Sequence, residues 1–361
     1  MDRRVLLASA VPAALTTAAL NSGTPATAAP RRPRADDVLQ VRDIGSFHVG
    51  GRAVTLTGAP LRDAFAGPDQ PPAVIDPNGD FEVGQVYVQY CALARPVSPH
   101  PLVMWHGGGL TGVCFETTPD GRPGWQRDFL GHGHDVYLTD ALAGGRAPFA
   151  RYPELSGAEP RFRTKRELWE LFRFGPAGSY TTEPGHRAPH PDTLFPTASF
   201  DTFVKQVVPR FTTYTEATQH AYGALLDRLG TSVVLTHSAA GPLGFAATLA
   251  APHRVAAHVA VEPSGAPDPD TVDLASIRHV PHLIVWGDHL GLDDDPGGSW
   301  ANLYSSTRRF HDALLAAGGQ STWIDLPDHG VTGNSHMIMM DRNSRDVADL
   351  IASWLRRHGL G

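Results

Sequence analysis

Polar and hydrophobic positions alternate early in the chain, and short, mainly hydrophobic runs follow. The alternation covers residues 53–57 and 84–90 and is typical of antiparallel strands with one face in solvent. Hydrophobic runs follow at residues 102–105, 136–138, 233–235, 255–261 (which includes His258) and 283–286, and a last strand pattern covers 321–326. Such runs are typical of parallel strands that are buried on both faces.

Segments with helical periodicity lie between and after these runs. They cover residues 166–174, 217–229, 243–251, 304–317 and 345–358. Strands that alternate with helices in this way predict an α/β fold, with a mostly parallel central sheet and helices on both faces. Residues 141–215 hold only one clear helix among many Pro, Gly and aromatic residues, so we expect a cap insertion over the active site there. Residues 30–361 are expected to form one domain that includes this cap.

The first 29 residues have the features of an export signal. Arg3 and Arg4 precede a run of apolar and small residues at 5–20, and residues 26–28 (Ala-Thr-Ala) fit a small-x-small cleavage site. The arginine pair resembles a twin-arginine signal, and the choice between that route and the general secretory route stays open. A proline and several threonines argue against a membrane anchor, and no later segment is long enough to span a bilayer. We therefore expect residues 1–29 to be a cleaved signal peptide, the mature protein to be secreted, and no stable membrane insertion.

Composition and charge argue against some classes of binding partner. The chain has 361 residues, with 30 Lys and Arg against 37 Asp and Glu, a formal net charge of −7, and no basic stripe. A nucleic-acid partner is not expected, because nucleic-acid binding needs clustered positive charge. The two cysteines, Cys91 and Cys114, are too few for a disulfide framework, and both a single bridge and two free thiols are open. These features do not indicate an oligomeric state.

One serine stands where a nucleophile is expected. Ser238 follows the hydrophobic run 233–235 and precedes the helical segment 243–251. A serine on a tight turn from strand to helix exposes its Oγ at the edge of the sheet, and the N-terminus of the helix faces negative charge that develops there. The pattern departs from G-x-S-x-G, because Thr236 and Ala240 occupy the glycine positions. An ordinary N-cap serine is the competing interpretation.

A glycine-rich segment follows the run 102–105. His106 is followed by Gly107, Gly108 and Gly109, whose lack of side chains lets backbone N–H groups approach an oxyanion. A phosphate-binding loop is disfavoured, since neither G-x-G-x-x-G nor the lysine of a P-loop follows. We therefore interpret this segment as the oxyanion loop of an acyl-transfer enzyme.

Two histidines compete for the role of general base. His336 lies on a loop between the last strand pattern and the last helix, and His329 lies seven residues upstream. The order serine, acid, histidine, with the histidine on this last loop, is typical of α/β-hydrolases. Its position favours His336 over His329.

The acid of the triad also has two candidates. Asp288 follows a hydrophobic run, but the position three residues beyond Gly287, where many α/β-hydrolases carry the acid, is Leu290. Glu262 directly follows the preceding hydrophobic run, and a carboxylate at the carboxyl end of a strand can reach the second ring nitrogen of the histidine. We favour Glu262 and keep Asp288 as the alternative.

Longer segments of the chain resemble a known family. Residues 106–112 (HGGGLTG), 116–125 (ETTPDGRPGW), 261–263 (VEP) and 333–337 (GNSHM) look like the bacterial esterase 713-like branch of the α/β-hydrolase superfamily. The resemblance extends over most of the mature chain, and these segments are far more specific than a serine turn alone.

The resemblance implies a complete catalytic set. In that branch the triad is Ser, Glu and His, which implies Ser238, Glu262 and His336 here, with oxyanion-hole N–H groups from Gly108 and Ala239. The implied activity is that of a secreted serine carboxylic ester hydrolase that acts on small-molecule esters through an acyl-enzyme, without a cofactor or metal. An amidase, lactonase or peptidase on the same fold, and a non-catalytic binding protein with the hydrolase scaffold, stay open as alternatives.

Overall fold

The structure, a computed structural model, describes residues 38–361 except 65–66, 152–153, 157–158 and 293–298. The expected signal peptide, residues 1–29, lies outside the described residues. The chain divides at Val38 into two units, and all described helices and strands belong to the second, Leu39–Gly361. No helix among the described residues is both long and apolar enough to cross a membrane.

Eight of the described strands form one mixed sheet. They are β1 (Val41–Leu56), β4 (Gly79–Leu93), β5 (Leu102–Trp105), β6 (Val136–Asp140), β7 (Ser232–His237), β8 (Val255–Val261), β9 (His282–Trp286) and β10 (Ser321–Asp325). Their order across the sheet is β1-β4-β6-β5-β7-β8-β9-β10, and the six strands from β6 to β10 are parallel. The predicted α/β fold with a mostly parallel sheet is confirmed.

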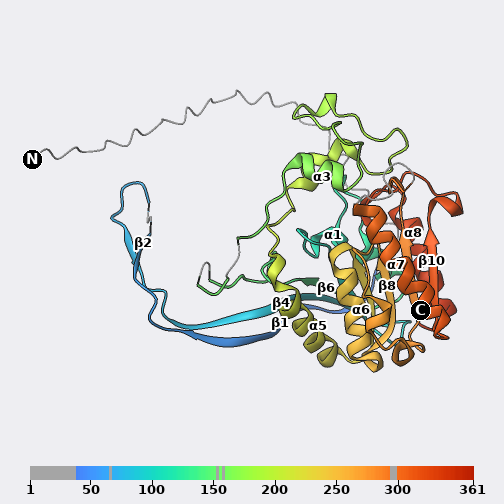
Figure 1. Ribbon diagram of the computed structural model, residues 1–361, viewed down its shortest axis with the longest axis horizontal. Helices are drawn as coiled ribbons and strands as arrows, with labels where there is room; N and C mark the ends of the chain where they lie inside the picture. The colour runs from blue at the N-terminus through green and yellow to red at the C-terminus, as the bar shows by residue number, and fades with distance from the viewer. Residues whose placement is uncertain (1–37, 65–66, 152–153, 157–158, 293–298) are drawn as a thin grey trace, which may run out of the picture. The chain divides into compact units, whose positions relative to one another are not determined.

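The antiparallel strands β1 and β4 lie at one edge of this sheet and are longer than the sequence pattern predicted. They pair along almost their whole length, whereas β4 pairs with β6 only from Tyr87 to Cys91. Their outer halves therefore form a two-stranded ribbon, drawn in blue and cyan in Figure 1. The chain between them adds a second small sheet of β2 (Arg62–Ala64) and β3 (Ala73–Ile75).

Helices cover both faces of the sheet (Figure 1). The described α-helices are α1 (Val113–Glu116), α2 (Trp125–Gly131), α3 (Lys165–Leu171), α4 (Phe200–Val204), α5 (Thr215–Leu229), α6 (Gly241–Ala250), α7 (Ser299–Ala316) and α8 (Ser344–Arg357). Helices α5, α6 and α7 pack on one face, and α2 and α8 pack together on the other. The five helices predicted from periodicity are present, whereas the short helices α1, α2 and α4 were not predicted.

Alternate residues of the parallel strands supply the cores on the two faces. In β5 and β7, Val103 and Val234 face α5, whereas Met104 and Leu235 belong to the core under α8, and all four are fully buried. Burying a side chain of this size contributes about 1.5–3 kcal/mol. This burial on both faces explains why β5 is hydrophobic at every position, and it holds the carboxyl ends of the parallel strands at one edge of the sheet.

The segment 141–215 runs between β6 and α5 and contains the short helices α3 and α4. Helix α3 begins with a capping box, in which Thr164 and Glu167 satisfy each other's backbone N–H groups. A cluster of buried aromatic rings holds the segment together: Trp169, Phe172, Phe174, Phe195, Phe200 and Phe203. The end of α3 is thereby fixed next to the loop that carries His336, since Phe172 O accepts the His336 N–H at 3.0 Å.

Both cysteine side chains are buried and free. Cys91 lies in β4 and Cys114 in α1, and no bridge joins them. Burial raises the pKa of both thiols, which favours the protonated, unreactive form.

Candidate active site

Ser238 begins a turn between β7 and α6 whose backbone is strained. Its φ is +53°, in the left-handed region that non-glycine residues rarely adopt, and it starts the 3₁₀ turn Ser238–Ala240. The side chain is only half-buried, at the carboxyl edge of the sheet. Gly241 makes the turn possible, because a Cβ there would lie 2.5 Å from Cβ of Pro263. Positive φ at a serine between strand and helix is the geometry of a nucleophile elbow.

His336 is buried and hydrogen-bonded to Glu262. Its Nδ1 lies 3.0 Å from Glu262 Oε2, and its backbone oxygen accepts a hydrogen bond from Nε2 of His237 at 2.9 Å. Because an ionised carboxylate can only accept, Nδ1 carries the proton and Nε2 is left as the basic nitrogen. Burial is the main cause that lowers the pKa of His336, and Glu262 counteracts it only in part, so the ring is neutral at pH 7.

Ser238 and His336 belong to one site, although no hydrogen bond joins them in the described part of the chain. His237, which precedes the serine, has its ring centroid 4.6 Å from that of His336. Hydrogen bonds between nucleophile and base are often long without substrate and shorten in the complex. The structure thus brings the three residues expected of a triad to the same edge of the sheet.

Glu262 is fully buried and accepts three hydrogen bonds. Besides His336, the donors are Nη2 of Arg173 at 2.7 Å and the backbone N–H of Gly287 at 2.5 Å. Burial alone would raise the pKa of Glu262, but the charge of Arg173 and the bond to His336 outweigh it and lower the pKa to about 2. Like Ser238, Glu262 has a positive φ, +50°, directly after its strand. The carboxylate is therefore ionised and fixed on the histidine.

Asp288 and His329, the alternative acid and base from the sequence, do not form this pair. Asp288 directs its carboxylate at the backbone N–H groups of His289, at 2.7 Å, and Gly333, at 2.9 Å, and does not contact His336. His329 lies on an exposed 3₁₀ turn after β10. Asp288 thus supports the loop before His336 rather than the imidazole itself.

The loop that carries His336 is anchored by the buried carboxylate of Asp341. Asp341 accepts hydrogen bonds from the backbone N–H and the hydroxyl of Ser335 and from Nδ2 of Asn334. Arg122 donates to the carbonyl oxygens of Met340 and Asp341 at 2.8 and 2.9 Å. The segment 116–125, which the sequence singled out, therefore supports the loop that carries His336 through Arg122.

The glycine loop lies directly against the serine. The backbone N–H of Ala141 donates to Nε2 of His106, so Nδ1 of His106 carries the proton and donates to Gly107 O at 2.8 Å. This bond fixes the start of the loop. The N–H of Gly108 donates to no described residue and is free for an oxyanion. Ala239, the other expected donor, directly follows Ser238 in the 3₁₀ turn.

Gly107 leaves no room for a side chain, which gives a direct test. A Cβ at this position would lie 2.8 Å from Cβ of Ser238 and 2.8 Å from Nδ1 of His237. We expect Gly107→Ala to displace the serine and to lower kcat on 4-nitrophenyl acetate by about 10²-fold, since a shift near 1 Å is sufficient for a loss of that size. Gly131→Ala at the end of α2, where a Cβ meets nothing within 4 Å, is the control. Equal kcat in the two variants would contradict the placement of the loop.

Arg173 is the residue at the site that the sequence did not reveal. It is 3% exposed, has φ +58°, pairs with Glu262, and lies over the ring of Trp300 with its guanidinium carbon 4.5 Å from the centroid. The only signal in the sequence is a charged residue between Phe172 and Phe174 in an apolar stretch. Its partner lies 89 positions away, so no local pattern could identify it.

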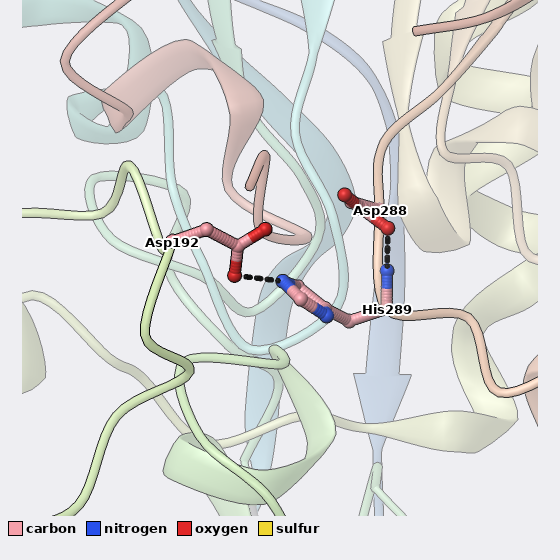
Figure 2. Close-up of side chains that lie close together, drawn as sticks. All are labelled: Asp192, Asp288 and His289. Carbon is pink, nitrogen blue, oxygen red and sulfur yellow. Dashed lines mark hydrogen bonds and ion pairs between the residues drawn. The ribbon is translucent and has the colours of Figure 1, made fainter. Parts of the chain in front are cut away.

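One group of side chains near the site has the composition of a cation site. Ligand atoms of Asp192, Asp288 and His289 lie within 4.8 Å of one another. Figure 2 shows Asp192 pointing at Nε2 of His289, at 3.1 Å, while the carboxylate of Asp288 bonds to the backbone of His289. The ring of His190 stacks on that of His289 with centroids 3.9 Å apart. Because both oxygens of Asp288 already accept backbone N–H groups, we interpret the group as polar and stacking contacts that link residues 190–192 to the turn after β9.

Comparison with known proteins gives the family. No family model matches the chain. Over 331 residues it is 30% identical to a probable secreted lipase, phiG, of Fungal sp. (strain ATCC 74256), in an alignment that covers 77% of this chain and 88% of the lipase. A solved structure of a novel bacterial esterase is 32% identical, with a TM-score of 0.75 over 91% of this chain and 99% of that one. The chain therefore belongs to the α/β-hydrolase superfamily, in its bacterial esterase 713-like branch, and is an enzyme of the esterase and lipase class.

Proposed function

We propose that this enzyme hydrolyses carboxylic esters with Ser238 as nucleophile, His336 as general base and Glu262 as the triad carboxylate that orients and stabilises the imidazole. The observation that carries the proposal is the buried bond between Nδ1 of His336 and Glu262, at 3.0 Å, next to a serine on a strained turn. This arrangement holds a neutral imidazole with its basic nitrogen unbonded within the described residues, as general-base catalysis requires.

Each step of the reaction has a group on the protein that performs it. Nε2 of His336 takes the proton of Ser238 while Oγ attacks the ester carbonyl, and Glu262 stabilises the imidazolium that forms. The N–H groups of Gly108 and Ala239 stabilise the tetrahedral oxyanion. The imidazolium then protonates the leaving alcohol, and a water molecule, activated by the same histidine, releases the acid from the serine.

Secretion is part of the proposal. Residues 1–29 carry the export-signal pattern, and phiG, which is 30% identical, is named a secreted lipase. N-terminal sequencing of the protein from the culture medium of its producing cells is expected to begin after residue 29. An intact residue 1 on the exported protein would contradict a cleaved signal.

Covalent labelling tests the assignment of the nucleophile. A fluorophosphonate reacts with an activated serine, with phosphorus bonding to Oγ and fluoride leaving, so mass spectrometry is expected to place the label on Ser238. His336→Ala is expected to prevent the labelling because the base is lost. Turnover of an ester and its matched amide then identifies the bond that is hydrolysed. A protein that hydrolyses esters while the label lies on another residue would refute the triad.

The pH dependence follows from the environment of His336. Burial, opposed by Glu262, leaves the pKa of His336 below its ordinary 6.5, and the pKa of Glu262 is about 2. Since the neutral imidazole is the active base, we expect kcat/KM on a neutral ester to fall on the acid side with a midpoint below 6.5 and to be constant from about pH 7 to pH 9. An acid-side midpoint above 7 would contradict the proposed base.

A further inference from the structure

Arg210 lies directly against the loop expected to bind the oxyanion. A Cβ on Gly108 would lie 2.8 Å from Cδ and Nε of Arg210 and 2.9 Å from its Cζ. The same segment is fixed to the loop by its backbone, since the N–H of Val208 donates to Gly109 O at 3.0 Å. The guanidinium of Arg210 is thus held beside a backbone N–H group that faces the reacting carbonyl in the proposed mechanism.

Arg163 belongs to the chain segment that pairs with Arg210. Arg161 and Arg210 form an antiparallel β-bridge with N–H to O distances of 2.8 and 3.0 Å. Arg163 follows Arg161 by two residues and is half-buried, whereas Phe162 between them is 65% exposed. The charge of Arg210 acts on Arg163 and contributes to its lowered pKa, after burial and Arg161. After burial, which is the main cause, the charges of Arg173 and Arg163 also lower the pKa of His336.

Neither Arg163 nor Arg210 is neutralised by a residue that the structure describes. Nε of Arg163 is buried without a hydrogen-bond partner. The charge of Glu167 acts on Arg163, but its carboxylate forms its ion pair with Arg161, at 3.3 Å. Burial lowers the pKa of both Arg163 and Arg210, which shows that their charged forms are partly removed from water. Two partly desolvated like charges are unfavourable by themselves, and an anion between them would offset that cost.

We propose that Arg163 and Arg210 form a carboxylate subsite beside the nucleophile, so that the preferred substrates are esters carrying a carboxylate a few bonds from the scissile carbonyl. This inference rests on the proposed function of Ser238. A guanidinium presents parallel N–H donors that match the two oxygens of a carboxylate. Since Arg210 contacts Gly108, only a short chain fits between carbonyl and carboxylate, as in hemiesters of short dicarboxylic acids.

Two matched pairs of esters test the subsite. Monoethyl glutarate and ethyl pentanoate differ only in a terminal carboxylate on the acyl side, and 4-acetoxybutanoate and butyl acetate differ in the same way on the alcohol side. We expect kcat/KM for the anionic member of at least one pair to fall about 10- to 100-fold in Arg163→Gln and in Arg210→Gln, because charge-assisted hydrogen bonds are lost. The neutral esters are expected to change less than about threefold. Arg166→Gln, an exposed arginine of α3, is the matched control.

A second measurement needs no variant. Raising the salt concentration from about 20 to 500 mM is expected to lower kcat/KM for the preferred anionic ester and to leave its neutral partner unchanged, because salt screens the arginines. Equal loss on anionic and neutral esters in Arg210→Gln would show that Arg210 acts on the oxyanion and would overturn the subsite. An unchanged ratio in both pairs would overturn it as well, with ester hydrolysis intact. Turnover of none of the four esters by the wild-type enzyme would refute the proposed function itself.

Discussion

Ser238→Ala is expected to lower kcat on 4-nitrophenyl acetate by roughly 10⁴- to 10⁶-fold, the largest loss of any single change in this enzyme. The alanine removes the only Oγ on the strained turn after β7, so no acyl-enzyme can form, while the expected oxyanion donors stay in place. Any residual rate comes from the N–H groups of Gly108 and Ala239 acting on a water molecule.

The stability of this variant separates loss of the nucleophile from loss of the fold. The serine hydroxyl forms no hydrogen bond with a described residue, so alanine is expected to change the free energy of unfolding by less than about 1 kcal/mol. Ser305→Ala, at an exposed position of α7, controls for the loss of a hydroxyl and is expected to keep full activity. Turnover above about a hundredth of wild type in well-folded Ser238→Ala would contradict the assignment.

The sheet could be predicted from the sequence because its signals are local. The mainly hydrophobic run 255–261 has the same bounds as β8, since all of its residues except the half-buried Ala256 are buried between the two helical layers. Residues 41–52 of β1 and 79–83 of β4 were missed for the opposite reason. Their side chains are exposed or half-buried, so a regular hydrophobic pattern is not required there.

The site could be predicted only in part, because its geometry depends on residues far apart in the chain. Glu262 directly follows β8 and Asp288 stands two residues after the neighbouring parallel strand β9, so position alone favours Glu262 without excluding Asp288. What distinguishes them is the positive φ of Glu262, which turns its carboxylate toward His336, and the contact with Arg173. Neither feature leaves a local pattern in the residues around the strand.

The second prediction with a large expected effect tests whether Glu262 or Asp288 is the carboxylate that acts on His336. Glu262→Gln is expected to lower kcat about 10⁴-fold, because an amide that donates toward Nδ1 of His336 favours the tautomer with the proton on Nε2, which cannot accept the serine proton. Asp288→Asn changes only the bonds to two backbone N–H groups and is expected to lower kcat less than about tenfold. The reverse order of the two losses, measured with both variants folded, would make Asp288 the acid.

The free energy of unfolding provides a second, independent measurement on Glu262→Gln. Glu262→Gln leaves Arg173 buried at 3% exposure without its counter-charge, which is expected to reduce the free energy of unfolding by about 3–5 kcal/mol. The double variant Glu262→Gln with Arg173→Met removes the unpaired charge and is expected to recover most of that loss, measured by urea unfolding, while kcat stays at the level of Glu262→Gln alone. If kcat recovered together with stability, the carboxylate would serve only to neutralise the arginine. Stability that recovers without kcat would instead show that Glu262 acts on the imidazole of His336.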